Sequence, residues 1–97
     1  MKSLDVLTEL EETIVARLAD ANPSSSYTAR LAASGMSRVA QKVGEEGVEV
    51  AIAAASGAGD EALLSESADL LYHLTVLLVM RGLSLTDVAR VLASRQA

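Results

Sequence analysis

The chain has 97 residues, of which 51% are hydrophobic and 2% aromatic, and its formal net charge is −5 at pH 7. This length suits one domain, residues 1–97, with a core of Ala, Leu, Val and Ile side chains. The absence of cysteine excludes a disulfide framework and a thiolate metal site, and the acidic balance disfavours nucleic-acid binding through a basic surface.

The pattern of apolar residues and chain breakers predicts an all-α fold. In the first segment, leucine and isoleucine recur at spacings of three and four, which is typical of one helical face. Pro23 and the serines that follow it disfavour helix, and a Gly-Ala-Gly turn separates two long apolar segments. Ser84 and Asp87 have the spacing of a capping box at the start of the last helix. The predicted helices cover residues 4–19, 27–33, 37–56, 60–81 and 85–94.

Segment 37–56 carries its charges on one side of the predicted helix. At about 100° per residue, five charged side chains fall within an arc of roughly 100°. They are Arg38, Lys42, Glu45, Glu46 and Glu49. A solvated face with a Lys42–Glu46 pair explains this arc, so the segment alone does not indicate a functional site. Gly47 lies in the adjoining apolar sector and costs the helix about 1 kcal/mol, which a close helix contact would explain.

Segment 60–81 changes the interpretation of those charges. After its first turn its only acids are Glu66 and Asp69, which share one face, and His73 continues the same stripe. The next positions along that stripe, Val76 and Met80, are apolar, and the rest of the segment is rich in leucine. Because a helix that is apolar nearly all round is buried on most sides, we expect the two acids to face another helix.

The two acidic stripes are predicted to lie opposite each other, because a short turn makes segments 37–56 and 60–81 antiparallel neighbours. Buried carboxylates that repel one another must be protonated, ion-paired or bound to metal. Oxygen ligands favour hard ions such as Mg²⁺ or Mn²⁺. Inward-facing glutamates also build di-metal sites in helical bundles, but the Glu-x-x-His spacing of those sites is absent.

The spacing of the five acids resembles the Glu-Glu-x-x-Glu … Glu-x-x-Asp signature of the all-α, MazG-like nucleotide pyrophosphohydrolases. More narrowly, the chain resembles the phosphoribosyl-ATP pyrophosphohydrolase family of histidine biosynthesis, through residues 26–28, 38–42 and 68–74. The resemblance spans nearly the whole chain. It implies a bundle of four to five helices and hydrolysis of phosphoribosyl-ATP to phosphoribosyl-AMP and pyrophosphate.

The resemblance also implies roles for individual residues. The expected ligands of Mg²⁺, or of Mn²⁺, are Glu46, Glu49, Glu66 and Asp69. Glu45 is expected to be a further ligand, a base or a supporting group, and Glu45 and Glu46 are the predicted catalytic pair. Arg38, Lys42, Tyr27 and Thr28 are candidates for substrate contact, although Tyr27 and Thr28 are equally well explained as a helix start packed on the core. His73 is either an ordinary core histidine or, four residues after Asp69, a hydrogen-bond partner that supports a ligand.

Two other functions remain compatible with the sequence. The first is a housecleaning pyrophosphohydrolase that acts on a free (d)NTP, with the same carboxylates and a different base and sugar specificity. The second is an acidic helical interaction module without catalysis. Mg²⁺ binding that is lost on Glu49→Gln would argue against the module.

Oligomeric state and location are predicted from the apolar surface and from the lack of a targeting signal. Segment 60–81 is apolar on more sides than one small bundle covers, so we expect a homodimer with this helix near the interface. The first residues are too acidic for a signal peptide, and the uncharged run 70–80 is about half of a membrane span. We therefore expect a cytoplasmic protein without membrane contact.

Overall fold

The computed structural model describes residues 2–20 and 22–96. These residues form five α-helices and, within the described part, no strand. The helices are α1 (Lys2–Ala19), α2 (Tyr27–Ala33), α3 (Met36–Ala55), α4 (Asp60–Met80) and α5 (Leu85–Gln96). The all-α prediction is confirmed, and each helix end lies within two residues of its predicted position.

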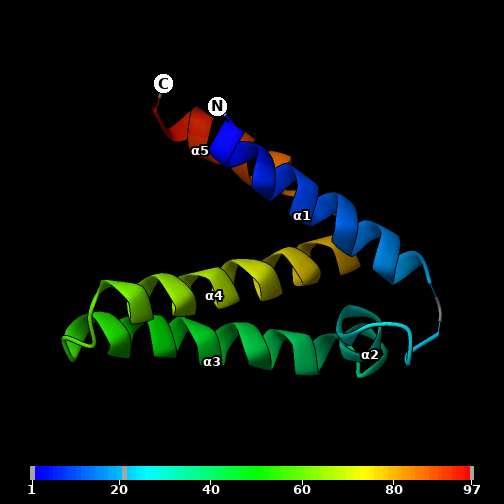
Figure 1. Cartoon of the computed structure of the whole chain (residues 1–97). Helices are drawn as coiled ribbons and strands as arrows, with labels where there is room; N and C mark the ends of the chain where they lie inside the picture. Colours follow the sequence, from blue (N-terminus) through cyan, green and yellow to red (C-terminus); the bar gives the residue numbers. More distant parts are fainter. Residues whose placement is uncertain (1, 21, 97) are drawn as a thin grey trace.

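The two longest helices, α3 and α4, lie side by side and antiparallel (Figure 1). The turn between them contains Gly59, whose φ of 101° is a backbone conformation that side-chain-bearing residues rarely adopt. Helix α1 packs against α4, and the short α2 lies across the start of α3. The predicted antiparallel pairing of the two acidic segments is therefore confirmed.

The last helix is attached mainly through its first turn. Ser84 and Asp87 exchange hydrogen bonds there: Ser84 N–H donates to Asp87 Oδ2 at 3.0 Å, and Asp87 N–H donates to Ser84 Oγ at 3.1 Å. This is the predicted capping box. In addition, Leu85 N–H donates to Glu11 Oε1 of α1 at 2.6 Å. No described residue of α5 is buried.

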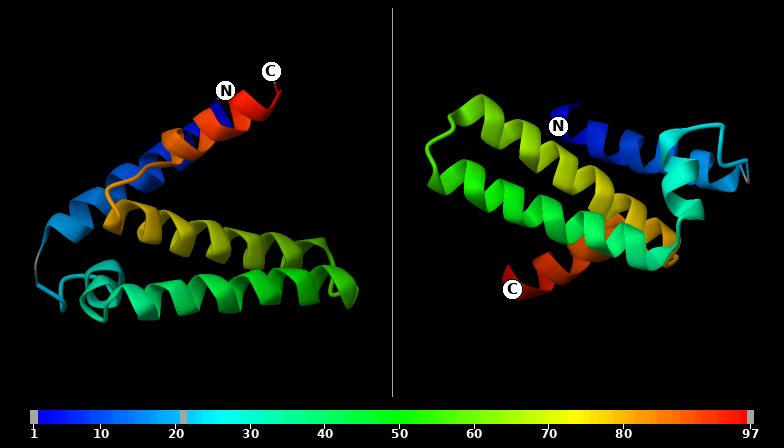
Figure 2. Two further views of the ribbon diagram at one scale, coloured as in Figure 1. Left: turned by 180° about the vertical axis from the view of Figure 1, so that it is seen from behind. Right: turned by 90° about the horizontal axis from the view of Figure 1, so that it is seen from below.

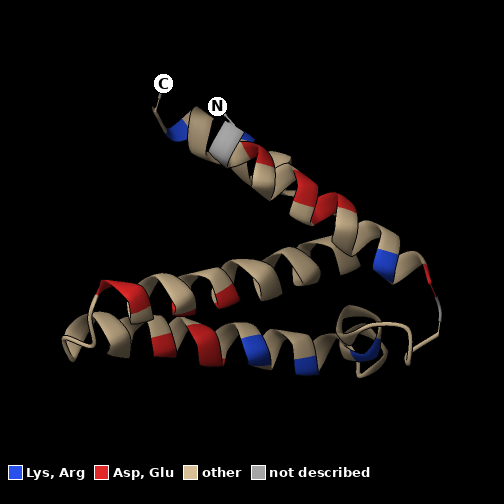
Figure 3. Ribbon diagram, in the orientation of Figure 1, with Lys and Arg blue, Asp and Glu red and all other residues tan. Residues whose placement is uncertain are grey.

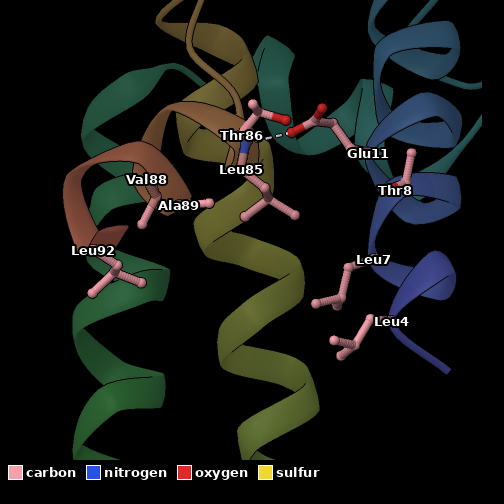
Figure 4. A pocket seen from close by; sticks show the side chains of 9 residues that line it. All are labelled: Leu4, Leu7, Thr8, Glu11, Leu85, Thr86, Val88, Ala89 and Leu92. Carbon is pink, nitrogen blue, oxygen red and sulfur yellow. Dashed lines mark hydrogen bonds between the residues drawn. The ribbon is translucent and has the colours of Figure 1, made fainter. Parts of the chain in front are cut away.

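Beyond that contact α1 and α5 diverge, as the second view in Figure 2 shows. The hollow between them has a volume of about 340 Å³ and is lined mainly by leucine, valine and alanine (Figure 4). Its one charged side chain, Glu11, is already engaged by Leu85 N–H. This hollow therefore offers no group for acid–base or metal chemistry.

The core lies at one end of the α3–α4 pair, where α1 and α2 cover it. Its fully or nearly buried apolar side chains are Ile14, Leu31, Val39 and Val76. At the other end of the pair, Val48, Ile52 and Leu64 are 58%, 59% and 69% exposed. A Cβ atom at Gly47 would meet nothing within 4 Å, so the expected close helix contact at that glycine is wrong within this chain.

Helix α4 is the one described helix that is long and apolar enough to cross a membrane, with a mean hydropathy of 1.4 over its most apolar stretch. The core helices of proteins without any membrane contact meet the same criterion, so this observation is weak support for a span. Only 17% of that stretch is buried within the chain. The apolar surface of α4 thus exceeds what the other four helices cover.

Candidate active site

The five predicted acids lie where the middle of α3 faces the first half of α4 (Figure 3). Their exposure differs more than the sequence predicts. Glu46 is buried and Glu66 is half-buried, whereas Glu45, Glu49 and Asp69 are exposed. The sequence predicts that Glu66 and Asp69 face another helix and are buried there. Glu66 is half-buried beside Glu49 of α3, whereas Asp69 is exposed, because α3 covers only one side of α4.

The carboxyl groups of α3 and α4 lie close enough to change the pKa of Glu66. The pKa of Glu66 is raised above its usual value, first because its carboxyl group shares a hydrogen bond with Glu49 and then because of partial burial. The negative charges of Glu49, Asp69 and Glu46 raise it further. Four of the predicted acids therefore form one electrostatic cluster, although Glu66 and Glu49 belong to different helices.

Glu46 is the member of this cluster that the fold encloses, with 7% of the residue exposed. Its Oε1 atom is buried and has no hydrogen bond of acceptable geometry. Nδ1 of His73 lies 2.5 Å from it, a close polar contact without alignment for a hydrogen bond. A buried carboxylate oxygen without a hydrogen bond is costly, so this atom is available to a cation.

His73 is buried and connects the cluster to α2. Its Nδ1 atom lies 3.0 Å from the backbone oxygen of Asp69, and its Nε2 atom lies 2.8 Å from the hydroxyl of Tyr27. His73 therefore contacts the backbone of Asp69 and the side chain of Glu46, and its predicted role in supporting a ligand stays a prediction. The helix phase could not show this, because the Glu46 contact depends on how α3 packs against α4.

The two candidates in α2 have different environments. Thr28 is fully buried and its hydroxyl is hydrogen-bonded to that of Tyr72, so the structure gives it a packing role. Its predicted substrate contact stays a prediction that this burial does not favour. Tyr27 is 43% exposed, its ring stacks on Tyr72 at 6.2 Å, and Arg30 lies 5.8 Å from the ring centre. Tyr27 therefore keeps a surface that a ligand can reach.

The basic residues precede the acids along α3. Arg38 is exposed and Lys42 is half-buried. Among the described residues the ion pairs are His73–Glu46 and Arg90–Asp87, so the Lys42–Glu46 pair of the simple surface interpretation is not formed. The side chains of Arg38 and Lys42 are therefore available to an anionic ligand that binds beside the carboxylate cluster.

The oxygen-rich donor set fits a hard divalent cation. A buried, unsatisfied Oε1 of Glu46 and the raised pKa of Glu66 both indicate negative charge that a cation would neutralise. In the described conformation no three acidic or histidine side chains converge closely enough to hold an ion by themselves. Glu49 and Glu66 also line an open hollow of about 290 Å³, whose other walls are small or apolar side chains of α3, α4 and their connecting turn.

The sequence profile of the phosphoribosyl-ATP pyrophosphohydrolase family matches residues 7–96. The chain belongs to this family. It is 54% identical over 93 residues to a phosphoribosyl-ATP pyrophosphatase of Pyrobaculum calidifontis, and the match covers 96% of this chain and 97% of that protein. A second such pyrophosphatase, from Pyrobaculum arsenaticum, is 55% identical over 94 residues, which is 97% of this chain and 98% of the relative.

Some relatives of this family member are larger. The histidine biosynthesis bifunctional protein HisIE of Vibrio cholerae is 57% identical over 84 residues, which is 87% of this chain. The chain spans only about 40% of the length of that bifunctional relative.

Two side chains near the site of this phosphoribosyl-ATP pyrophosphohydrolase family member were missed by the sequence reasoning. Gln41 Nε2 donates to Glu45 Oε2 at 2.9 Å, and Tyr72 anchors Thr28. The i,i+4 spacing of Gln41 and Glu45 is a signal that could have found the first contact. The second joins positions 44 residues apart, and no local pattern predicts it.

Proposed function

We propose that this chain hydrolyses phosphoribosyl-ATP to phosphoribosyl-AMP and pyrophosphate, a step of histidine biosynthesis. Support comes from the names of the two Pyrobaculum relatives, which contain phosphoribosyl-ATP, and from that of the Vibrio cholerae relative, which contains histidine biosynthesis. We further propose that Mg²⁺, or Mn²⁺, is its cofactor and that its ligands are Glu46, Glu49, Glu66 and Asp69. The observation that carries this assignment is the buried, unsatisfied Oε1 of Glu46 next to a carboxylate cluster that raises the pKa of Glu66.

When bound, the cation supplies charge neutralisation of the phosphates and activation of a water molecule. The water oxygen forms a bond to the α-phosphorus, and the bond to the bridging α–β oxygen breaks in line, so that pyrophosphate leaves. Glu45 takes the proton of the attacking water, since it is exposed next to the cluster and Gln41 holds its Oε2 atom. Arg38 and Lys42 lie along the same helix and bind phosphate oxygens of the substrate.

The test is pyrophosphate release in the presence of Mg²⁺, measured in parallel on phosphoribosyl-ATP, ATP and dCTP. We expect turnover of phosphoribosyl-ATP with a kcat/KM well above that of the other two compounds, and no turnover in the presence of a chelator. Rapid hydrolysis of ATP or dCTP without hydrolysis of phosphoribosyl-ATP would instead identify a (d)NTP pyrophosphohydrolase. No turnover of any of them would favour a non-catalytic module.

We propose a cytoplasmic location and a homodimer in which the exposed apolar side chains of α3 and α4 face a second copy. Support comes from Val48, Ile52, Leu64 and Leu71, which are 41% to 69% exposed on neighbouring helices. Several large exposed apolar side chains on two paired helices of a small protein indicate an interaction site. Closing it against the same surface of a second copy gives a symmetric dimer.

The dimer predicts a mass of twice 10.1 kDa in light scattering at micromolar protein. Ile52→Lys is expected to shift the mass to that of one chain, because it places a charge among the exposed apolar side chains of α3 and α4. Val15→Lys, at a valine of α1 that is 51% exposed, is the matched control and is expected to leave the dimer intact. A dimer that survives Ile52→Lys and dissociates on Val15→Lys would move the interface to α1.

A further inference from the structure

Three side chains form a continuous chain of polar contacts from α2 to the carboxylate cluster. Nδ1 of His73 faces two acceptors, the backbone oxygen of Asp69 at 3.0 Å and Oε1 of Glu46 at 2.5 Å, so Nδ1 carries the hydrogen. In the neutral ring Nε2 is then an acceptor, and the Tyr27 hydroxyl, 2.8 Å away, donates to it. Tyr27 therefore donates to His73, the Nδ1 hydrogen of His73 is directed at the backbone oxygen of Asp69, and the same nitrogen is in close polar contact with Oε1 of Glu46.

The surroundings of His73 hold the ring in this orientation. The rings of Tyr27 and Tyr72 stand nearly perpendicular to it, each at 88°, with centroids 5.8 and 5.1 Å away. Thr28, next to Tyr27, is fully buried and bonded to Tyr72, next to His73. Hydrogen bonds thus join two adjacent residues of α2, Tyr27 and Thr28, to two adjacent residues of α4, His73 and Tyr72. A rotation of the imidazole would break polar contacts at both of its nitrogen atoms.

We infer that His73 is a positioning residue that fixes the buried carboxylate of Glu46 for cation binding, and that Tyr27 fixes His73. The inference rests on the proposed function, because it takes Glu46 as a cation ligand. Nδ1 carries a hydrogen whether or not Nε2 is protonated, so the positioning does not depend on the charge of the ring. A partner that orients a ligand in this way is worth about 10- to 100-fold in metal affinity. The link also places the cation site under the influence of α2, whose Tyr27 is exposed.

The experiment measures Mn²⁺ affinity of the full chain by calorimetry, without substrate. His73→Leu removes all three polar contacts of the ring and is expected to weaken Mn²⁺ binding by about 10- to 100-fold. His73→Asn places an amide nitrogen at the position of Nδ1, so it keeps a polar N–H group beside the Asp69 backbone oxygen and Glu46 and is expected to recover part of the affinity. Tyr27→Phe keeps the ring and removes only the hydroxyl, and a smaller weakening is expected.

Thr75→Val is the matched control. Thr75 is fully buried on the same helix and its hydroxyl donates to the backbone oxygen of Leu71, so the substitution removes a buried hydrogen bond away from the carboxylates. Its Mn²⁺ affinity is expected to equal that of the unmodified chain. If the loss of any buried polar contact in α4 lowered the Mn²⁺ affinity, Thr75→Val would lower it too, and His73→Asn would not recover it. That result would give His73 a structural role only.

The outcomes distinguish a failure of the proposed cofactor from a failure of the proposed role of His73. If the unmodified chain binds no Mn²⁺, the cofactor assignment is overturned and the positioning role with it. If the unmodified chain binds Mn²⁺ and the His73→Leu, His73→Asn and Tyr27→Phe variants bind it equally well, only the positioning role is overturned. Should His73→Leu fail to fold, the ranking of unmodified chain, Tyr27→Phe and His73→Asn still decides.

Discussion

Glu46→Gln is expected to lower the kcat/KM of pyrophosphate release from phosphoribosyl-ATP by more than about a hundredfold, since even residues that only support a metal ligand are worth 10- to 100-fold. The substitution keeps the size of the side chain and removes its negative charge. It acts at the one acid of the cluster that is buried and whose Oε1 atom lacks a hydrogen bond. Mn²⁺ affinity, measured without substrate, is expected to fall in parallel.

The same substitution is expected to leave the fold intact. A buried carboxylate close to other carboxylates opposes folding, so its neutral amide should unfold at the same temperature or higher in the presence of a chelator. Glu12→Gln, the same chemical change at an exposed position of α1, is the control and should retain full activity. Activity of Glu46→Gln within tenfold of the unmodified chain would remove Glu46 from the ligand set.

Local patterns in the sequence predict the helices of this chain well. Three of the five helices begin at a signal that acts within a few residues: Ser26 caps α2, Gly59 precedes α4, and Ser84 with Asp87 caps α5. The facing acidic stripes also follow from local rules, because a short turn leaves α4 little choice but to return along α3.

The environment of each acid could not be predicted in the same way. Helix phase places Glu46 and Glu49 on one face, but whether a carboxylate is buried depends on the side chains that other helices bring to it. Glu46 is enclosed because His73 of α4 meets it, and His73 is fixed by Tyr27, which lies 46 residues earlier in the chain. Asp69 is exposed because no described helix covers that side of α4. Contacts of this range depend on tertiary packing, for which periodicity carries no information.

Ile14→Ala is expected to reduce the free energy of unfolding by about 2–5 kcal/mol, the usual range for deleting most of a buried isoleucine. Ile14 is fully buried, and it brings α1 into contact with the core residues Leu31, Val39 and Val76. Small domains have only about 5–15 kcal/mol in total, so this single change removes a large part of the stability. The measurement is urea unfolding at one fixed protein concentration, because dimerisation would make the stability depend on concentration.

Val15, the next residue of α1, provides the control for this stability change. Mn²⁺ affinity shows whether the change also affects function. Val15→Ala, at a side chain that is 51% exposed, should change the stability by less than about 0.5 kcal/mol, and Ile14→Val by about 0.5–1.5 kcal/mol. Equal effects of Ile14→Ala and Val15→Ala would contradict the position of the core. Because Ile14 packs on the end of α4 that carries Val76, whereas Glu66 and Asp69 lie nearer the opposite end, Ile14→Ala should leave Mn²⁺ affinity unchanged at temperatures where the protein is still folded. The core end of the α3–α4 pair then determines the free energy of unfolding, and the acidic end determines cation binding.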